Sequence, residues 1–213
     1  MNVETLIDTL SADVKPVRRH AVARRIALGL LMGGAATAIL IAIGLGIRPD
    51  LGLAMRGYSF WVKWLYTLSL TVCALILVAR LARPGRSASR WLWLLPVQVC
   101  LLAVIGVVEM AHVPQAEWLA MWLGHSWKVC SSLVLMLAAP IFVGLLWSFR
   151  RLAPTRLRAA GAAAGLAAGS CAATLYCLHC PEVSAIFVLT WYTLGIALAA
   201  GAGALLGPRV LRW

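Results

Sequence analysis

The chain has 213 residues, of which 62% are hydrophobic and only 12% are charged, and its mean hydropathy is strongly positive. Water-soluble domains carry far more charge, so this composition excludes that class and indicates an integral membrane protein. The net charge of +12 does not require a nucleic-acid partner, because no loop is long enough for a folded reader module and the cations flank apolar runs, where they face anionic head groups.

Residues 1–25 are predicted to form a cytoplasmic tail. Its apolar side chains recur at three- and four-residue spacing among acidic and polar ones: Val3, Leu6, Ile7, Leu10 and Val14, with Asp13 just before the last. This spacing predicts a short amphipathic helix, which Pro16 would end. So short a helix is marginal on its own in water. Its apolar face therefore needs either a groove on a partner protein or the lipid surface.

Six apolar runs follow, each long enough to cross about 30 Å of hydrocarbon. They cover residues 26–47, 58–79, 91–111, 126–148, 157–178 and 184–206. The predicted fold class is all-α, a polytopic bundle of six transmembrane helices within a domain of residues 26–213. Of the 19 Lys and Arg residues, all but Arg48, Arg56, Lys63 and Lys128 flank the side that carries the termini. This asymmetry predicts a bacterial inner-membrane protein with both termini in the cytoplasm.

Small residues and prolines recur inside the runs. Pro96 and Pro140 interrupt the third and fourth runs and predict kinks. Glycines four residues apart predict close contact between helices, since lipid gives apolar side chains no reason to associate. These glycines are Gly29, Gly33, Gly161, Gly165, Gly169, Gly203 and Gly207.

The chemically distinctive residues fall on the opposite, extracytoplasmic side. Cys130 opens the fourth run and Cys180 lies in the hairpin after the fifth, so the two thiols meet if these helices are neighbours. That compartment is oxidising, which favours a redox-active or bridged pair. A bridge would close a loop of about 50 residues, worth on the order of 4 kcal/mol by chain entropy. Even half of that shifts a two-state equilibrium about 30-fold, which is enough for a switch.

Other uses of this hairpin stay open. Cys177 and Cys180 form a C-x-x-C pair that encloses His179, but the pair closes a helix, where the helix dipole disfavours a thiolate, so a thiol oxidoreductase is less favoured. Two thiolates with His125 or His179 would make a zinc site. A static disulfide that only joins helices is the plain alternative. A small transporter or permease is disfavoured because no run carries a charge near its middle.

Several segments of the chain recur together in one known family. They are Tyr176-x-x-His179-Cys180-Pro181-Glu182, Phe187, Trp191-Tyr192-x-x-Gly195-Ile196, Gly207-Pro208-Arg209-x-Leu211-Arg212-Trp213, Trp127-x-x-Cys130, Pro140-x-Phe142, Arg150-Arg151-Leu152-Ala153-Pro154 and the tail from Leu6 to Arg19. Together they resemble the NrsF-type anti-sigma-F factors, six-span inner-membrane proteins of proteobacteria. The resemblance covers essentially the whole chain, although Cys177 is not part of the family pattern.

The resemblance implies a regulator that is not an enzyme and needs no cofactor. It would sequester an extracytoplasmic-function sigma factor of RNA polymerase and release it under oxidative or heavy-metal stress. The family's two critical cysteines map onto Cys130 and Cys180, which are also the residues expected to meet any soft metal. The expected accessory residues are Cys177, His179, His125 and Glu182, and the expected sigma-binding residues of the tail are Leu6, Ile7, Leu10 and Asp13. The implied partners are the sigma factor and the lipid bilayer, with no direct contact to nucleic acid and no oligomeric state specified.

Overall fold

The computed structural model describes residues 3–12, 20–83, 89–150, 152 and 154–212, apart from the side chains of residues 10, 89 and 90. The described part is helical, and no strand occurs within these ranges. The elements are α1 (Val3–Ala12), α2 (Ala21–Leu40), η1 (Ile41–Leu45), α3 (Leu51–Ala54), α4 (Tyr58–Leu81), α5 (Ser89–Leu92), α6 (Leu94–Ala111), η2 (Gln115–Glu117), α7 (Trp118–Leu123), α8 (Trp127–Phe149), α9 (Leu157–Tyr176), α10 (Ala185–Phe187), η3 (Val188–Tyr192) and α11 (Thr193–Val210). The predicted all-α class is confirmed.

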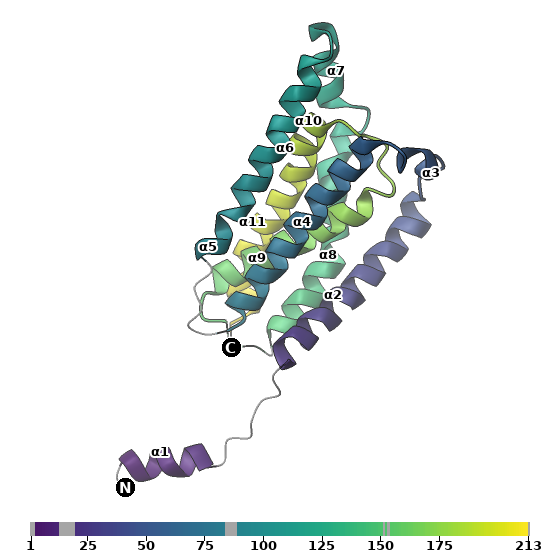
Figure 1. Cartoon of the computed structure of the whole chain (residues 1–213). Coiled ribbons are helices and arrows are strands. Elements are labelled where there is room, and N and C mark those ends of the chain that lie inside the picture. Colours follow the sequence, from purple (N-terminus) through teal and green to yellow (C-terminus); the bar gives the residue numbers. More distant parts are fainter. Residues whose placement is uncertain (1–2, 13–19, 84–88, 151, 153, 213) are drawn as a thin grey trace.

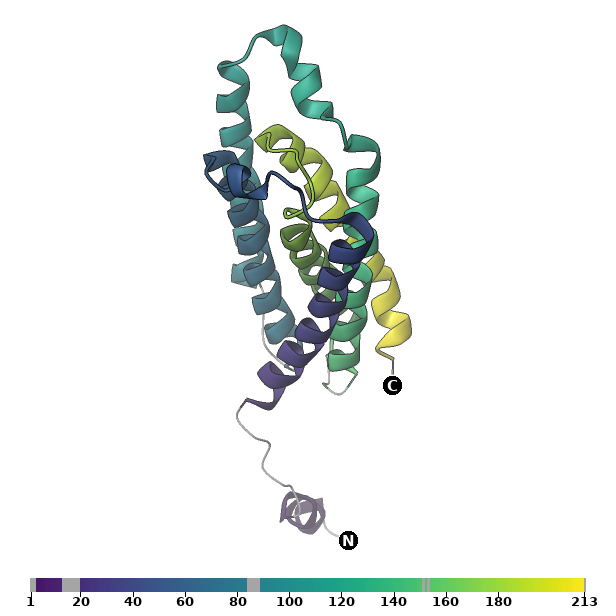
Figure 2. The same ribbon diagram turned by 90° about the vertical axis from the view of Figure 1, so that its right-hand side faces the viewer.

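Six helical stretches are long and apolar enough to cross a membrane. They are Ala21–Leu45, Tyr58–Leu81, Leu94–Ala111, Gln115–Phe149, Leu157–Tyr176 and Ala185–Val210. The predicted six spans are confirmed, and the first helix begins at Ala21, five residues before the apolar run does. Figures 1 and 2 show α1 and the end of α11 at one end of the bundle, while η2, α7 and α10 lie at the other end. An even number of spans accounts for this arrangement of the termini.

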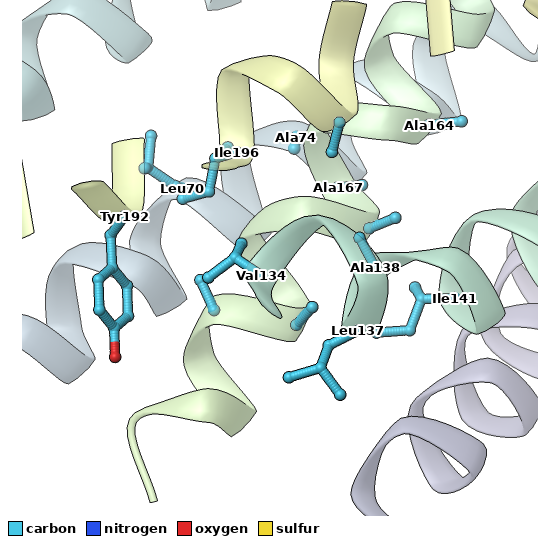
Figure 3. Packing of buried hydrophobic residues seen from close by; sticks show 14 of the residues in the cluster. Leu70, Ala74, Val134, Leu137, Ala138, Ile141, Ala164, Ala167, Tyr192 and Ile196 are labelled. Atoms are coloured by element: carbon cyan, nitrogen blue, oxygen red, sulfur yellow. The ribbon is translucent and has the colours of Figure 1, made fainter. Parts of the chain in front are cut away.

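Helix α9 is the centre of the bundle and packs against α4, α8 and α11. It is rich in alanine and glycine, and most of its residues are buried. Figure 3 shows how side chains from these helices meet beside it, with Leu70 and Ala74 of α4 and Val134 of α8 close to Ile196 of α11. Short side chains on α9 let three neighbours approach its backbone at once.

Glycine contacts form two helix crossings in the bundle, as the four-residue spacing predicted. On α9, Gly161 lies against the backbone of Gly203, and Gly165 against that of Ala199. On α2, Gly29 lies against Gly144 of α8, and a Cβ at Gly33 would lie 2.5 Å from the Ile141 Cα. The hydroxyls of Thr37 and Ser148 also form hydrogen bonds between α2 and α8. No larger side chain fits at these crossings.

The third span is interrupted at Trp93, three residues before Pro96, where α5 ends and α6 begins. Helix α6 begins at Leu94, so Pro96 lies in its first turn, where the missing N–H would have had no partner within the helix. Pro140 does lie inside α8. Helix α6 packs at the edge of the bundle, with only Leu102 and Gly106 buried among its described residues.

The tail forms the predicted helix, α1, which spans Val3–Ala12. Its apolar residues have no cover, since Val3 is 69%, Leu6 40% and Ile7 58% exposed. The side chain of Leu10 and all of Asp13 lie outside the described part of the chain, as does Pro16. The observed apolar face is therefore available to a partner or to lipid.

Candidate functional site

Three cysteines gather at the end of the bundle away from the termini. Cys130 lies in the first turn of α8, Cys177 caps the C-terminus of α9, and Cys180 lies in the hairpin of residues 177–184. All three are fully buried free thiols. The α9 helix unwinds here because Pro181, which has no N–H and clashes with the preceding turn, cannot continue it.

The structure brings Cys130 and Cys180 into direct contact. Their side chains hydrogen-bond to each other, and the Ser126 hydroxyl lies 3.9 Å from the Cys180 sulfur. The hydrogen bond from Cys130 lowers the pKa of Cys180 below its ordinary value; burial opposes this shift, and the charge of Lys63 adds to it. For Cys177, burial raises the pKa. These surroundings favour the thiolate form of Cys180 more than that of Cys177.

Lys63 is the cation beside this pair. It projects from α4 into the protein interior and is only 1% exposed. Its ammonium group donates to the carbonyl of Cys180 at 3.0 Å and to that of Glu182 at 2.7 Å. It also lies 5.3 Å from the centre of the Tyr192 ring. Moving an ammonium group into a protein interior costs several kcal/mol unless the charge is compensated. A lysine buried this deeply therefore indicates a nearby negative charge.

Two tyrosines complete the surroundings of Cys180. The rings of Tyr176 and Tyr192 lie 5.7 Å apart, and both side chains are buried. The Tyr192 hydroxyl is buried and has no hydrogen-bond partner in the described part of the chain. Tyr192 is the last residue of η3, a π-helical segment in which each turn holds more residues than an α-helical turn. Such segments are frequent at functional sites.

Arg48 and Gly46 fix the hairpin backbone from the loop after η1. The Arg48 N–H donates to the Leu178 carbonyl at 3.2 Å, and its guanidinium lies 3.5 Å from the Cys180 carbonyl. The same guanidinium pairs with Asp50 at 2.6 Å. The His179 ring nitrogen Nδ1 lies 2.8 Å from the Gly46 carbonyl. Two cations, Arg48 and Lys63, therefore hold the Cys180 carbonyl in place.

Glu182 ties the hairpin to the start of α8. Its carboxylate accepts the backbone N–H of His125 at 2.7 Å. Gly124 makes the approach feasible, since its φ is +56° and a Cβ there would lie 2.6 Å from the carboxylate. On the other side of the hairpin, Glu109 of α6 accepts the N–H of Ala185 at 2.7 Å. The hairpin is thus tethered to α4, α6 and α8 together.

The other candidate residues take part as tethers. The His125 side chain is exposed, and the His179 ring is turned to the Gly46 carbonyl, so neither joins the two sulfurs. Within the described ranges, no three His, Cys, Asp or Glu side chains are grouped so that they could hold a metal ion. The tail residues Leu6 and Ile7 lie in α1, at the far end of the molecule from the thiols (Figure 1).

Hydrogen bonds link α8, which carries Cys130, to α2, the first helix after the tail. The Thr37 hydroxyl of α2 donates to the Leu137 carbonyl of α8 at 2.9 Å. The Ser148 hydroxyl of α8 donates to the Arg25 carbonyl of α2 at 2.9 Å. Within a bilayer each such bond is worth about 0.6 kcal/mol on average. These two bonds join α8 to α2 over the part of α2 between Arg25 and Thr37.

Sequence reasoning missed Lys63 and Tyr192. The sequence places Lys63 only among the cations on the side away from the termini, and Tyr192 only within a segment of the family resemblance, because lysine and tyrosine near span ends usually lie at the membrane interface. Their burial depends on the helix face they occupy. The available signal was a lysine in the second turn of an apolar helix whose other charge, Arg80, lies in the last turn.

Comparison with known proteins gives the family. A family model described as "Negative regulator of sigma F" matches residues 10–213. The chain belongs to the NrsF family. A protein of Azospira oryzae named "Probable anti-sigma-F factor NrsF" is 40% identical over 213 residues, covering the full length of both chains. One of Caulobacter vibrioides named "Anti-sigma-F factor NrsF" is 40% identical over 215 residues, again covering both chains fully. No solved structure matches the chain.

The two halves of this NrsF family member therefore carry different features. Its hairpin end has the buried thiol pair with Lys63, and its terminal end has the exposed apolar face of α1. Helices α2 and α8 connect the two ends.

Proposed function

We propose that this chain is a membrane-bound anti-sigma factor. It sequesters an extracytoplasmic-function sigma factor at the cytoplasmic face and releases it when oxidation joins Cys130 to Cys180 in the periplasm. Membership of the NrsF family and the names of the two relatives support the sigma-factor role. The direct contact between the Cys130 and Cys180 side chains is the observation that carries the sensing role.

The proposed orientation rests on the cations. Arg24, Arg80, Arg156 and Arg209 all lie in segments at the end of the bundle that carries the termini. Lys and Arg accumulate on the cytoplasmic side of inner-membrane proteins, which places the termini inside the cell and the thiols outside. The thiols then face the oxidising compartment.

The proposed signal passes along α8. A disulfide bond draws two sulfurs to about 2.05 Å, closer than hydrogen-bonded thiols, so oxidation pulls the first turn of α8 toward the hairpin. Helix α8 packs on α2 through Gly144 and Gly29, where the backbones touch and leave no compliant side chains between them. A shift of α8 is therefore passed to α2 and to the presentation of α1. Heavy-metal stress is a second predicted input at the same two sulfurs.

The thiol oxidoreductase alternative is disfavoured by burial. Cys130, Cys177 and Cys180 are all 0% exposed, so the dithiol of a protein substrate has no route to them. A sensor that reacts with a small oxidant needs no such route.

The decisive experiment replaces Cys130 and Cys180 together by serine. We expect the double variant to hold its sigma factor normally and to lose the peroxide response of the sigma-dependent genes, because no bridge can form. The measurement is reporter expression with and without peroxide. The matched control is Cys100→Ser, since Cys100 is an exposed thiol on α6 far along the helix from the hairpin. A normal response in the double variant would exclude sensing by this pair.

A further inference from the structure

We propose that Lys63 is the charge partner of the Cys130–Cys180 pair and the proton source for its oxidation by a peroxide. The inference rests on the proposed function and adds a residue outside the matched cysteine pattern. Lys63 is 1% exposed, and its ammonium group donates to the carbonyls of Cys180 and Glu182 at 3.0 and 2.7 Å. Both contacts place its charge on the same turn of the hairpin as the Cys180 sulfur.

The nearest carboxylate is already engaged elsewhere. Glu182 contacts Lys63 through its backbone carbonyl, while its side chain accepts the His125 N–H at 2.7 Å. Within the described ranges, no Asp or Glu side chain forms an ion pair with Lys63; the two ion pairs found there are Arg48–Asp50 and His125–Glu182. The negative charge that balances Lys63 must then come from the thiols.

The charged and titratable groups around Cys180 come from every element that packs on it. They are Cys130 from α8, Lys63 from α4, Tyr176 and Cys177 from α9, Tyr192 from η3, Arg48 from the loop after η1, and Glu182 from the hairpin itself. Arg48 is committed to Asp50 at 2.6 Å. Lys63 is the buried cation of this group that has no acidic partner, and it is therefore the one matched to a Cys180 thiolate.

The oxidation balances only if a proton is supplied. The Cys180 thiolate attacks one oxygen of hydrogen peroxide, the O–O bond breaks, and the product is a sulfenic acid and hydroxide. Lys63 gives that hydroxide a proton, which makes water and leaves a neutral amine. The Cys130 sulfur then attacks the Cys180 sulfur, and the hydroxyl group leaves with the Cys130 proton as a second water. The pair loses two electrons and the peroxide gains them.

The same proton transfer keeps the buried site neutral in both redox states. The reduced site holds one thiolate and one ammonium group, and the oxidised site holds a disulfide and a neutral amine. Without the transfer, a disulfide would leave an uncompensated ammonium group in the interior. After the transfer, the amine keeps its two carbonyl acceptors through uncharged and therefore weaker hydrogen bonds. Oxidation thus weakens the hydrogen bonds between Lys63 of α4 and the hairpin while the new disulfide links the hairpin covalently to α8.

The test measures how fast hydrogen peroxide forms the Cys130–Cys180 disulfide in the full-length purified protein across about pH 6 to 8. The wild type should show a nearly flat profile, because Lys63 keeps the thiolate present throughout. For Lys63→Met we expect a fall of about tenfold or more at neutral pH and a rate that rises with pH, because burial then opposes the thiolate with only the hydrogen bond from Cys130, and no buried cation, to offset it. Lys63→Arg should restore the flat profile with a lower plateau, since arginine keeps its proton.

The control variant is Lys128→Met. Lys128 lies on the first turn of α8, near the same end of the bundle, but over the Trp127 ring. It should behave as the wild type. A general loss of packing in Lys63→Met would lower the rate equally at every pH, so a flat profile for that variant overturns the proposal.

A second measurement needs no variant. Oxidation of the wild type by peroxide in weakly buffered solution should take up no proton, because Lys63 neutralises the hydroxide. Uptake of about one proton per disulfide would show that Lys63 keeps its charge and would overturn the proton-source role. If the wild type forms no disulfide at all, the proposed oxidative switch fails. If it forms one with the same pH profile in Lys63→Met, only the role of Lys63 fails.

Discussion

Cys177 and Cys180 are three residues apart, yet their surroundings give them different chemistry. The Cys177 thiol donates to the Ala173 carbonyl at 3.2 Å and lies at the C-terminal end of α9, where the helix dipole disfavours a thiolate. Cys180 lies beyond the end of the helix, where it accepts the hydrogen bond from Cys130 and lies near the positive charge of Lys63. The C-x-x-C spacing therefore does not make a redox pair in this hairpin.

Replacing Cys177 tests this difference. We expect Cys177→Ser to change the rate of Cys130–Cys180 disulfide formation by less than about twofold, since a serine hydroxyl can make the same bond to the Ala173 carbonyl. Cys180→Ser should abolish the disulfide. Mass spectrometry of peroxide-treated protein measures both. A disulfide that includes Cys177 in the wild type would contradict the assignment.

At the scale of elements, α2 and α8 form the connection between the thiols and the tail. Their contact depends on glycine, because Gly29 and Gly33 each touch α8 backbone. Gly34 is the neighbouring residue on the same helix, and a Cβ there meets nothing within 4 Å. A side chain added at Gly33 therefore changes both the packing and the helix propensity, whereas one added at Gly34 changes the helix propensity alone.

Leucine at these two positions should give opposite results. Gly33→Leu must push α2 away from Ile141 and Pro140, which we expect to lower stability by about 1–3 kcal/mol and to weaken the peroxide response. Gly34→Leu should leave both unchanged or slightly raise stability, since leucine is the better helix former. Thermal unfolding in detergent and the sigma-dependent reporter measure the two effects. Equal behaviour of the two variants would remove the α2–α8 contact from the account.

The elements also show how far sequence reasoning reached. The six spans and the glycine crossings were predictable, because a bilayer demands long apolar helices and close backbone contact demands missing side chains. The interruption near Pro96 was predictable because proline lacks the N–H of the helical ladder, whereas the position of the break at Trp93 depends on the neighbouring turn. Lys63 was missed because its rotation about the α4 axis is set by α9 and the hairpin, which are more than 100 residues away along the chain.

At the scale of the whole molecule, the proposed switch connects two ends of the bundle that do not touch. The thiol pair lies at the hairpin end and α1 at the terminal end (Figures 1 and 2). The only free-energy source proposed is the bridge itself, on the order of 4 kcal/mol for a loop of about 50 residues, and less in a bilayer where the unfolded reference is not a free coil. Half of this value changes the affinity at the other end by about 30-fold at most, since coupling is reciprocal.

The most direct test measures the affinity of the purified sigma factor for the full-length protein in lipid nanodiscs, once with Cys130 and Cys180 reduced and once with the disulfide formed. We predict tight binding to the reduced protein and binding weaker by about tenfold or more to the oxidised protein. The Cys130→Ser, Cys180→Ser double variant should bind equally well under both conditions. Equal affinity of the reduced and oxidised wild type would contradict the claim that this sulfur pair controls the partner on the far side of the membrane.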